Sequence, residues 1–98
     1  MVYSIEEIKE KTIPIAKEYG LISLYLFGSY IKGVADEDSY IDLLYDGELT
    51  GLLQYSSLVR KLESILGCPV DLVSTNSNNK KLLHNIKKDG VLLYEKER

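Results

Sequence analysis

The chain has 98 residues, 45% of them hydrophobic and 28% charged, which excludes a disordered chain and predicts a single globular domain over residues 1–98. No apolar run is long enough to cross a bilayer, and the N-terminal MVYSIEEIKE lacks the layout of a signal peptide, so we expect a cytoplasmic protein that does not contact membranes. The net charge is −3, and residues 1–49 carry ten acids against four lysines. Binding to nucleic acid usually requires a basic surface, so direct nucleic-acid binding is not expected.

The first part of the chain predicts a helix followed by a buried strand. Ser4 and Glu7 have the spacing of a capping box, and the apolar residues that follow keep helical spacing, which predicts a helix over residues 4–19. Pro14 should kink or divide this helix, because its ring removes one hydrogen bond and collides with the preceding turn. The short apolar segment 21–27, LISLYLF, lies between two glycines and predicts a strand.

The rest of the chain alternates between strand and helix patterns. Residues 52–66, between two glycines, carry a strong amphipathic helical pattern. The remaining expected elements are strands at 40–45, 70–73 and 91–94 and a helix at 80–88. This order predicts a mixed α/β (α+β) domain in which helices pack on a small mixed β-sheet.

A glycine turn follows the first predicted strand. Gly28 allows backbone N–H groups to approach an anion closely, and the hydroxyl of Ser29 can donate to the same anion. A short helix opening at this turn would add its dipole. Gly-Ser after a strand is by itself also typical of an ordinary tight turn.

Two later strands each carry one acid among apolar residues. Side chains alternate along a strand, so Ile41 and Leu43 point to the core while Asp42 points to solvent or a cleft. Asp71 is placed in the same way in the segment PVDLVS. An unpaired buried carboxylate is costly, so both acids should lie at a cleft or be held by partners. Position 40, on the face of Asp42, is a tyrosine.

The segment LFGSYIKGVADEDSYIDLLYD, with the later CPVDLVSTN and LLHNIKKDGVLLYEKER, resembles the minimal nucleotidyltransferases, which belong to the polymerase beta-like nucleotidyltransferase superfamily. The family pattern is Gly-Ser, about ten residues, Asp-x-Asp on a strand, and a third carboxylate on a later strand. The resemblance covers nearly the whole chain, from about Ser4 to Glu95. It implies the polymerase beta-like nucleotidyltransferase fold, ATP as substrate and Mg²⁺ as cofactor.

The resemblance also assigns residues to roles. The nucleotide-binding residues that it implies are Gly28, Ser29, Lys32 and Gly33. It implies that Asp42 and Asp71 are catalytic and hold the metal. The first acid of the Asp-x-Asp pair would stand at position 40, where this chain has Tyr40.

Tyr40 is expected to reduce catalysis. A phenol is uncharged at neutral pH, so it offers Mg²⁺ a neutral oxygen where the family has a full negative charge. Asp38 could reach the metal in its place, although the run Asp36–Asp38 is also explained as a solvated turn. A single Mg²⁺, in place of the usual two, could be held by Asp42, Asp71 and the nucleotide phosphates.

Two functions therefore stay open. In the first, the chain transfers a nucleoside monophosphate from ATP to an acceptor, which the resemblance implies is a HEPN-domain partner neutralised as in an antitoxin. In the second, Tyr40 impairs catalysis, and the chain neutralises its HEPN-type partner by binding alone. The residues do not reveal the base preference, the acceptor or the oligomeric state.

Overall fold

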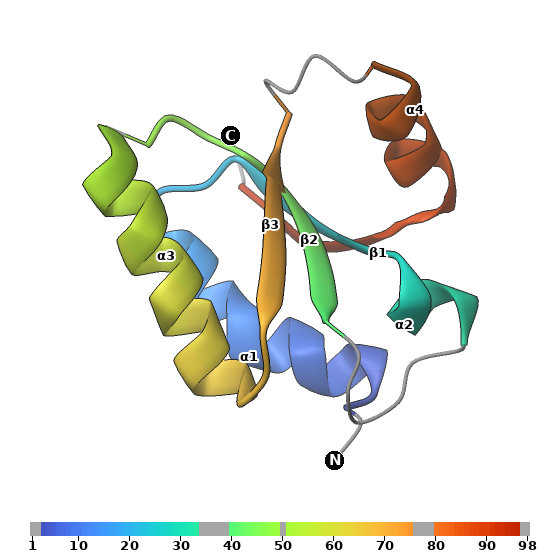
Figure 1. Ribbon diagram of the computed structural model, residues 1–98, viewed down its shortest axis with the longest axis horizontal. Helices are drawn as coiled ribbons and strands as arrows, with labels where there is room; N and C mark the ends of the chain where they lie inside the picture. Colours follow the sequence, from blue (N-terminus) through green and yellow to red (C-terminus); the bar gives the residue numbers. More distant parts are fainter. Residues whose placement is uncertain (1–2, 34–39, 50, 76–79, 97–98) are drawn as a thin grey trace.

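The computed structural model describes residues 3–33, 40–49, 51–75 and 80–96. Its elements follow the predicted order, with ends that differ from the prediction by at most two residues, and a short helix is added at the glycine turn. They confirm the mixed α/β fold (Figure 1). In chain order the elements are α1 (Ile5–Glu18), β1 (Ser23–Phe27), α2 (Ser29–Lys32), β2 (Ile41–Asp46), α3 (Gly51–Leu66), β3 (Val70–Ser74), α4 (Lys80–Asp89) and β4 (Val91–Glu95).

Helix α1 begins at the predicted capping box. The amide of Glu7 donates to Ser4 Oγ and the amide of Ser4 donates to Glu7 Oε1, each over 3.2 Å. The helix continues through Pro14, so it is not divided there, which was one of the two expected outcomes. Proline has no N–H, so the carbonyl of Glu10, four residues earlier, loses its usual helical partner. Pro14 and Glu10 are both exposed, so water can bond this carbonyl instead.

The four strands form one mixed sheet in the order β3-β2-β1-β4. Strand β1 runs antiparallel to both β2 and β4, whereas β2 and β3 are parallel and are joined through helix α3. Because of these directions, the C-terminal end of β1 lies beside the N-terminal ends of β2 and β3. We call this row of strand ends the edge of the sheet.

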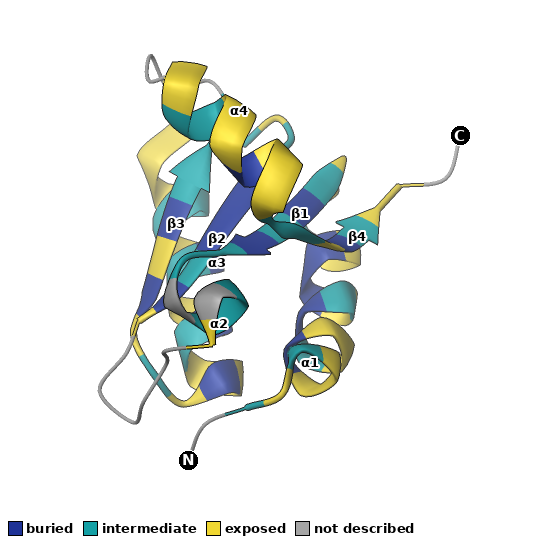
Figure 2. Cartoon of the chain, turned by 90° about the vertical axis from the view of Figure 1, so that its right-hand side faces the viewer, coloured by how far each residue is buried: buried dark blue, intermediate teal, exposed yellow. Residues whose placement is uncertain are grey.

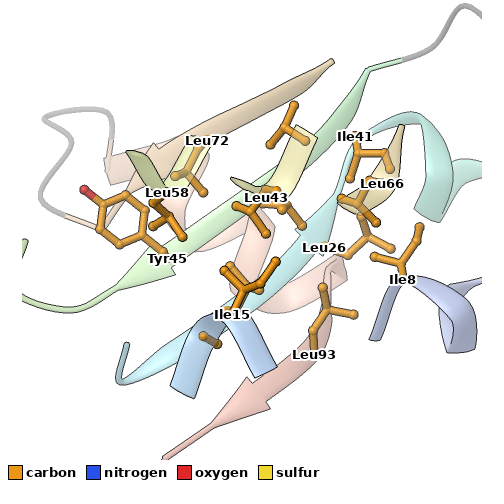
Figure 3. Packing of buried hydrophobic residues seen from close by; sticks show 14 of the residues in the cluster. Ile8, Ile15, Leu26, Ile41, Leu43, Tyr45, Leu58, Leu66, Leu72 and Leu93 are labelled. Atoms are coloured by element: carbon orange, nitrogen blue, oxygen red, sulfur yellow. The ribbon is translucent and has the colours of Figure 1, made fainter. Parts of the chain in front are cut away.

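Helices α1 and α3 cover one face of the sheet, and the main hydrophobic core lies between them and the strands (Figure 3). Alternate residues of β2, Ile41, Leu43 and Tyr45, point into this core, as the alternation in the sequence predicts. Residues packed there from other elements include Ile8, Ile15, Leu26, Leu58, Leu66, Leu72 and Leu93.

Helix α4 lies on the other side of the sheet from α1 and α3 (Figure 1). Leu44 and Ile86 are buried but lie outside the main core, which is consistent with a second, smaller apolar contact beneath α4. Asp42 shares the face of Leu44, because the two are separated by one residue of β2. None of the described helices is long and apolar enough to cross a membrane.

Candidate nucleotide-binding site

The residues that the sequence singles out meet in one row across the sheet. Phe27, the last residue of β1, pairs with Asp42 of β2, and Asp42 pairs in turn with Asp71 of β3. Directly paired residues point to the same face, and neighbouring strands lie about 5 Å apart. The two carboxylates therefore project side by side from the face of the sheet opposite the main core.

Gly28 follows Phe27 and packs against the side chain of Asp42. Its φ is +79°, a conformation that only glycine adopts readily. A Cβ atom built on Gly28 would overlap Asp42 Oδ2 and lie 2.9 Å from Asp42 Cγ. The amide of Ile31 donates to the Gly28 carbonyl over 3.1 Å, so the chain turns directly from Gly28 into the short helix α2. The glycine thus lets the turn and the carboxylate occupy adjoining space.

Helix α3 holds the outer edge of β3 on both sides of Asp71. Glu63 Oε2 accepts from the amide of Val70 over 3.1 Å, and the hydroxyl of Tyr55 donates to the carbonyl of Leu72 over 2.6 Å. Burial raises the pKa of Tyr55, so its phenol stays protonated and keeps this bond. Sequence patterns did not single out these two positioning residues, because the contacts join parts of the chain that no local periodicity connects.

Tyr40 lies one residue before β2, where the sequence had placed the first strand residue. Its side chain is 58% exposed, so a charged group at this position would remain in water. Tyr40, the residue that departs from the Asp-x-Asp pattern, is therefore exposed beside the site and is not part of the packed core.

The other predicted site residues are described to different extents. Gly33 ends α2 with a φ of +73°. The structure describes the backbone of Ser29 and Lys32 within α2, but their side chains lie outside what it describes, and so does Asp38. The roles that the resemblance assigns to these side chains stay predictions.

The donor set at this edge fits one divalent cation. Mg²⁺ prefers carboxylate oxygens and often takes only one or two from the protein, with the remainder from phosphates and water. The paired carboxylates of Asp42 and Asp71 repel each other, and a bound cation would relieve this repulsion. Within the described residues there is no group of three or more Asp, Glu, His or Cys side chains placed to hold a metal ion. That Asp42 and Asp71 hold a single ion shared with a nucleotide stays a prediction.

A glycine turn beside paired strand carboxylates, on a mixed sheet covered by helices, defines the class of nucleotidyltransferases. The model of the family "Polymerase beta, Nucleotidyltransferase" matches residues 10–98, and the chain belongs to this family. Within it, the chain is a minimal nucleotidyltransferase, as the sequence predicted.

Relatives and solved structures agree with this membership. The "Protein adenylyltransferase MntA" of Thermococcus cleftensis is 39% identical over 79 residues, which are 76% of this chain and 80% of that protein. A crystal structure of a toxin-antitoxin with AMP-PNP contains a chain that is 28% identical, with a TM-score of 0.77 over 91% of this chain and 74% of that one. An MNT antitoxin in complex with a tri-AMPylated HEPN toxin of Shewanella oneidensis matches with 26% identity and a TM-score of 0.71, over 93% of this chain and 72% of that one.

Proposed function

We propose that this chain is an antitoxin-like protein adenylyltransferase that binds ATP with Mg²⁺ and transfers AMP to a HEPN-type partner protein. The observation that carries the proposal is the meeting of Gly28, Asp42 and Asp71 at one edge of the sheet. The similar proteins named as an adenylyltransferase and as an antitoxin bound to an AMPylated HEPN toxin support the nucleotide and the partner. The cytoplasm remains the predicted location.

Each residue has a defined task in this proposal. The turn at Gly28 and Ser29, with Lys32 and Gly33, holds the triphosphate, and the carboxylates of Asp42 and Asp71 hold the metal. Bound Mg²⁺ supplies positive charge that neutralises the phosphates. An acceptor hydroxyl of the partner would attack the α-phosphorus and give up its proton to water, the bond from the α-phosphorus to the bridging oxygen would break, and pyrophosphate would leave. The protein's contribution is to align these groups and to stabilise their charge.

Tyr40 favours a second candidate, a module that neutralises a HEPN-type partner by binding it without modifying it. In this proposal Asp42 and Asp71 are the carboxylates that would hold the metal, and position 40 supplies a neutral phenol in place of a further one. Both candidates use the same fold and the same partner, and they differ only in whether AMP is transferred.

Incubation with a HEPN-type partner and ATP tests the first candidate. With Mg²⁺ and ATP labelled at the α-phosphate, we expect label on the partner, whereas ATP labelled at the γ-phosphate should leave none. Asp42→Asn, which keeps the size of the side chain and removes its charge, should abolish the labelling. Partner that is neutralised but never labelled would favour the binding module, and a chain that neither labels nor binds the partner would contradict both candidates.

A further inference from the structure

A pocket adjoins the candidate site on the side of Gly28 that faces helix α4. Its volume is about 490 Å³. Its lining residues come from the end of β1, helix α2 and helix α4, and Figure 2 shows where these elements lie. The lining residues are Phe27, Gly28, Ile31, Leu82, Asn85, Ile86, Asp89 and Gly90. Gly28 thus borders both this pocket and the carboxylate of Asp42, and a ligand at one can extend into the other.

The lining of the pocket suits an aromatic ring and not a phosphate chain. Phe27, Ile31, Leu82 and Ile86 supply apolar walls. Of the described residues that line the pocket, none is basic and one, Asp89, is acidic, so a polyphosphate would meet repulsion there. A larger hollow, about 680 Å³ between α1 and β4, shares no residue with the candidate site.

Among the described α4 residues that line this pocket, Asn85 carries an amide side chain. The lining residues of α4, Leu82, Asn85, Ile86 and Asp89, are three, four and seven positions apart, which places them on one face of the helix. An asparagine amide can accept a hydrogen bond from the N6 amino group of adenine and donate one to N7. Guanine presents two acceptors, O6 and N7, at this edge, so the amide cannot make the same pair of bonds to it.

We propose that this pocket binds the adenine ring of the nucleotide and that Asn85 is a residue that selects ATP over GTP. The inference rests on the proposed nucleotide site, because the phosphates of the same molecule would lie at Gly28 and the paired acids. The apolar walls supply contact area, and the amide supplies the selectivity. Asp89, at the same face of the helix, is placed to accept a hydrogen bond from a ribose hydroxyl.

Equilibrium binding of three ligands in Mg²⁺ tests the proposal: ATP, GTP and inorganic tripolyphosphate, which has the phosphates without the nucleoside. The natural chain should bind ATP more tightly than either of the others. Asn85→Ala should weaken ATP binding by about tenfold, the scale of a lost two-bond contact to a base, and leave tripolyphosphate binding unchanged. His84→Ala is the matched control, because His84 is an exposed neighbour on α4 that does not line the pocket.

The outcomes separate this inference from the proposed function. If ATP and tripolyphosphate both fail to bind the natural chain, the nucleotide site itself is wrong and the adenine pocket with it. If both bind equally, or if Asn85→Ala changes ATP binding no more than His84→Ala does, the phosphate site stands and the adenine pocket is overturned. Tighter binding of GTP than of ATP would likewise overturn the proposal.

Discussion

Replacing Tyr40 by aspartate should raise the rate of AMP transfer by about a hundredfold, the scale on which one preorganised electrostatic contact acts in catalysis. The change restores the first acid of the Asp-x-Asp pair two residues before Asp42. A carboxylate adds a full negative charge where the phenol offers a neutral oxygen, and a charge pair at about 4 Å is worth roughly 4 kcal/mol at an effective dielectric constant of 20, before desolvation is subtracted.

The fold should tolerate this substitution. Tyr40 is 58% exposed and lies outside β2, so the new carboxylate remains hydrated and displaces no packed side chain. The measurement is the initial rate of label transfer from α-labelled ATP to the partner at saturating Mg²⁺.

Tyr40→Asn is the control for this prediction, because asparagine has the shape of aspartate without its charge. We expect no gain in rate from it. Equal rates for the natural chain, Tyr40→Asp and Tyr40→Asn would show that position 40 does not limit transfer, and the assignment of Tyr40 to a metal-ligand position would be wrong.

Gly28→Ala should abolish Mg²⁺-dependent ATP binding and also destabilise the fold. The new Cβ would overlap Asp42 Oδ2 and approach Cγ to 2.9 Å, so either the carboxylate or the turn must move. The φ of +79° adds backbone strain of about 1–2 kcal/mol for a residue with a side chain. Urea denaturation measures the loss of stability, and ATP titration measures the loss of binding.

Gly20→Ala separates these two effects. Gly20, just beyond the end of α1, has a similar φ of +66°, but a Cβ there would meet nothing within 4 Å. We expect a similar cost in strain with ATP binding retained. If Gly28→Ala binds ATP as tightly as Gly20→Ala does, the contact between the turn and Asp42 has no part in the site.

Local sequence patterns predicted the order of the helices and strands well, and they failed where a contact outside the local pattern decides the conformation. The strand expected from Leu21 begins at Ser23, because the amide of Leu21 bonds instead to the carbonyl of Ala16 at the end of α1. Helix α1 is not divided at Pro14, where Pro14 and Glu10 are both exposed and water can bond the freed carbonyl. In both cases the apolar pattern was correct and the hydrogen-bond partner was not visible from it.

Local sequence patterns identified the acids of the candidate site, but not the tertiary contacts that bring them together. Alternation along the strands identified Asp42 and Asp71 as acids on a face away from the core, and the family pattern linked them to Gly28. Their direct pairing depends on the parallel register of β2 and β3, which local periodicity does not specify. The bonds from Tyr55 and Glu63 to β3 and the pocket beneath α4 depend on tertiary packing in the same way.

Calorimetric titration of ATP into the natural chain, with and without Mg²⁺, tests most directly whether Asp42 and Asp71 form a metal-nucleotide site. We expect that ATP binds in the presence of Mg²⁺, that binding weakens strongly without it, and that Asp42→Asn and Asp71→Asn each remove the dependence on Mg²⁺. ATP binding that is unaffected by Mg²⁺ or by either substitution would contradict this expectation.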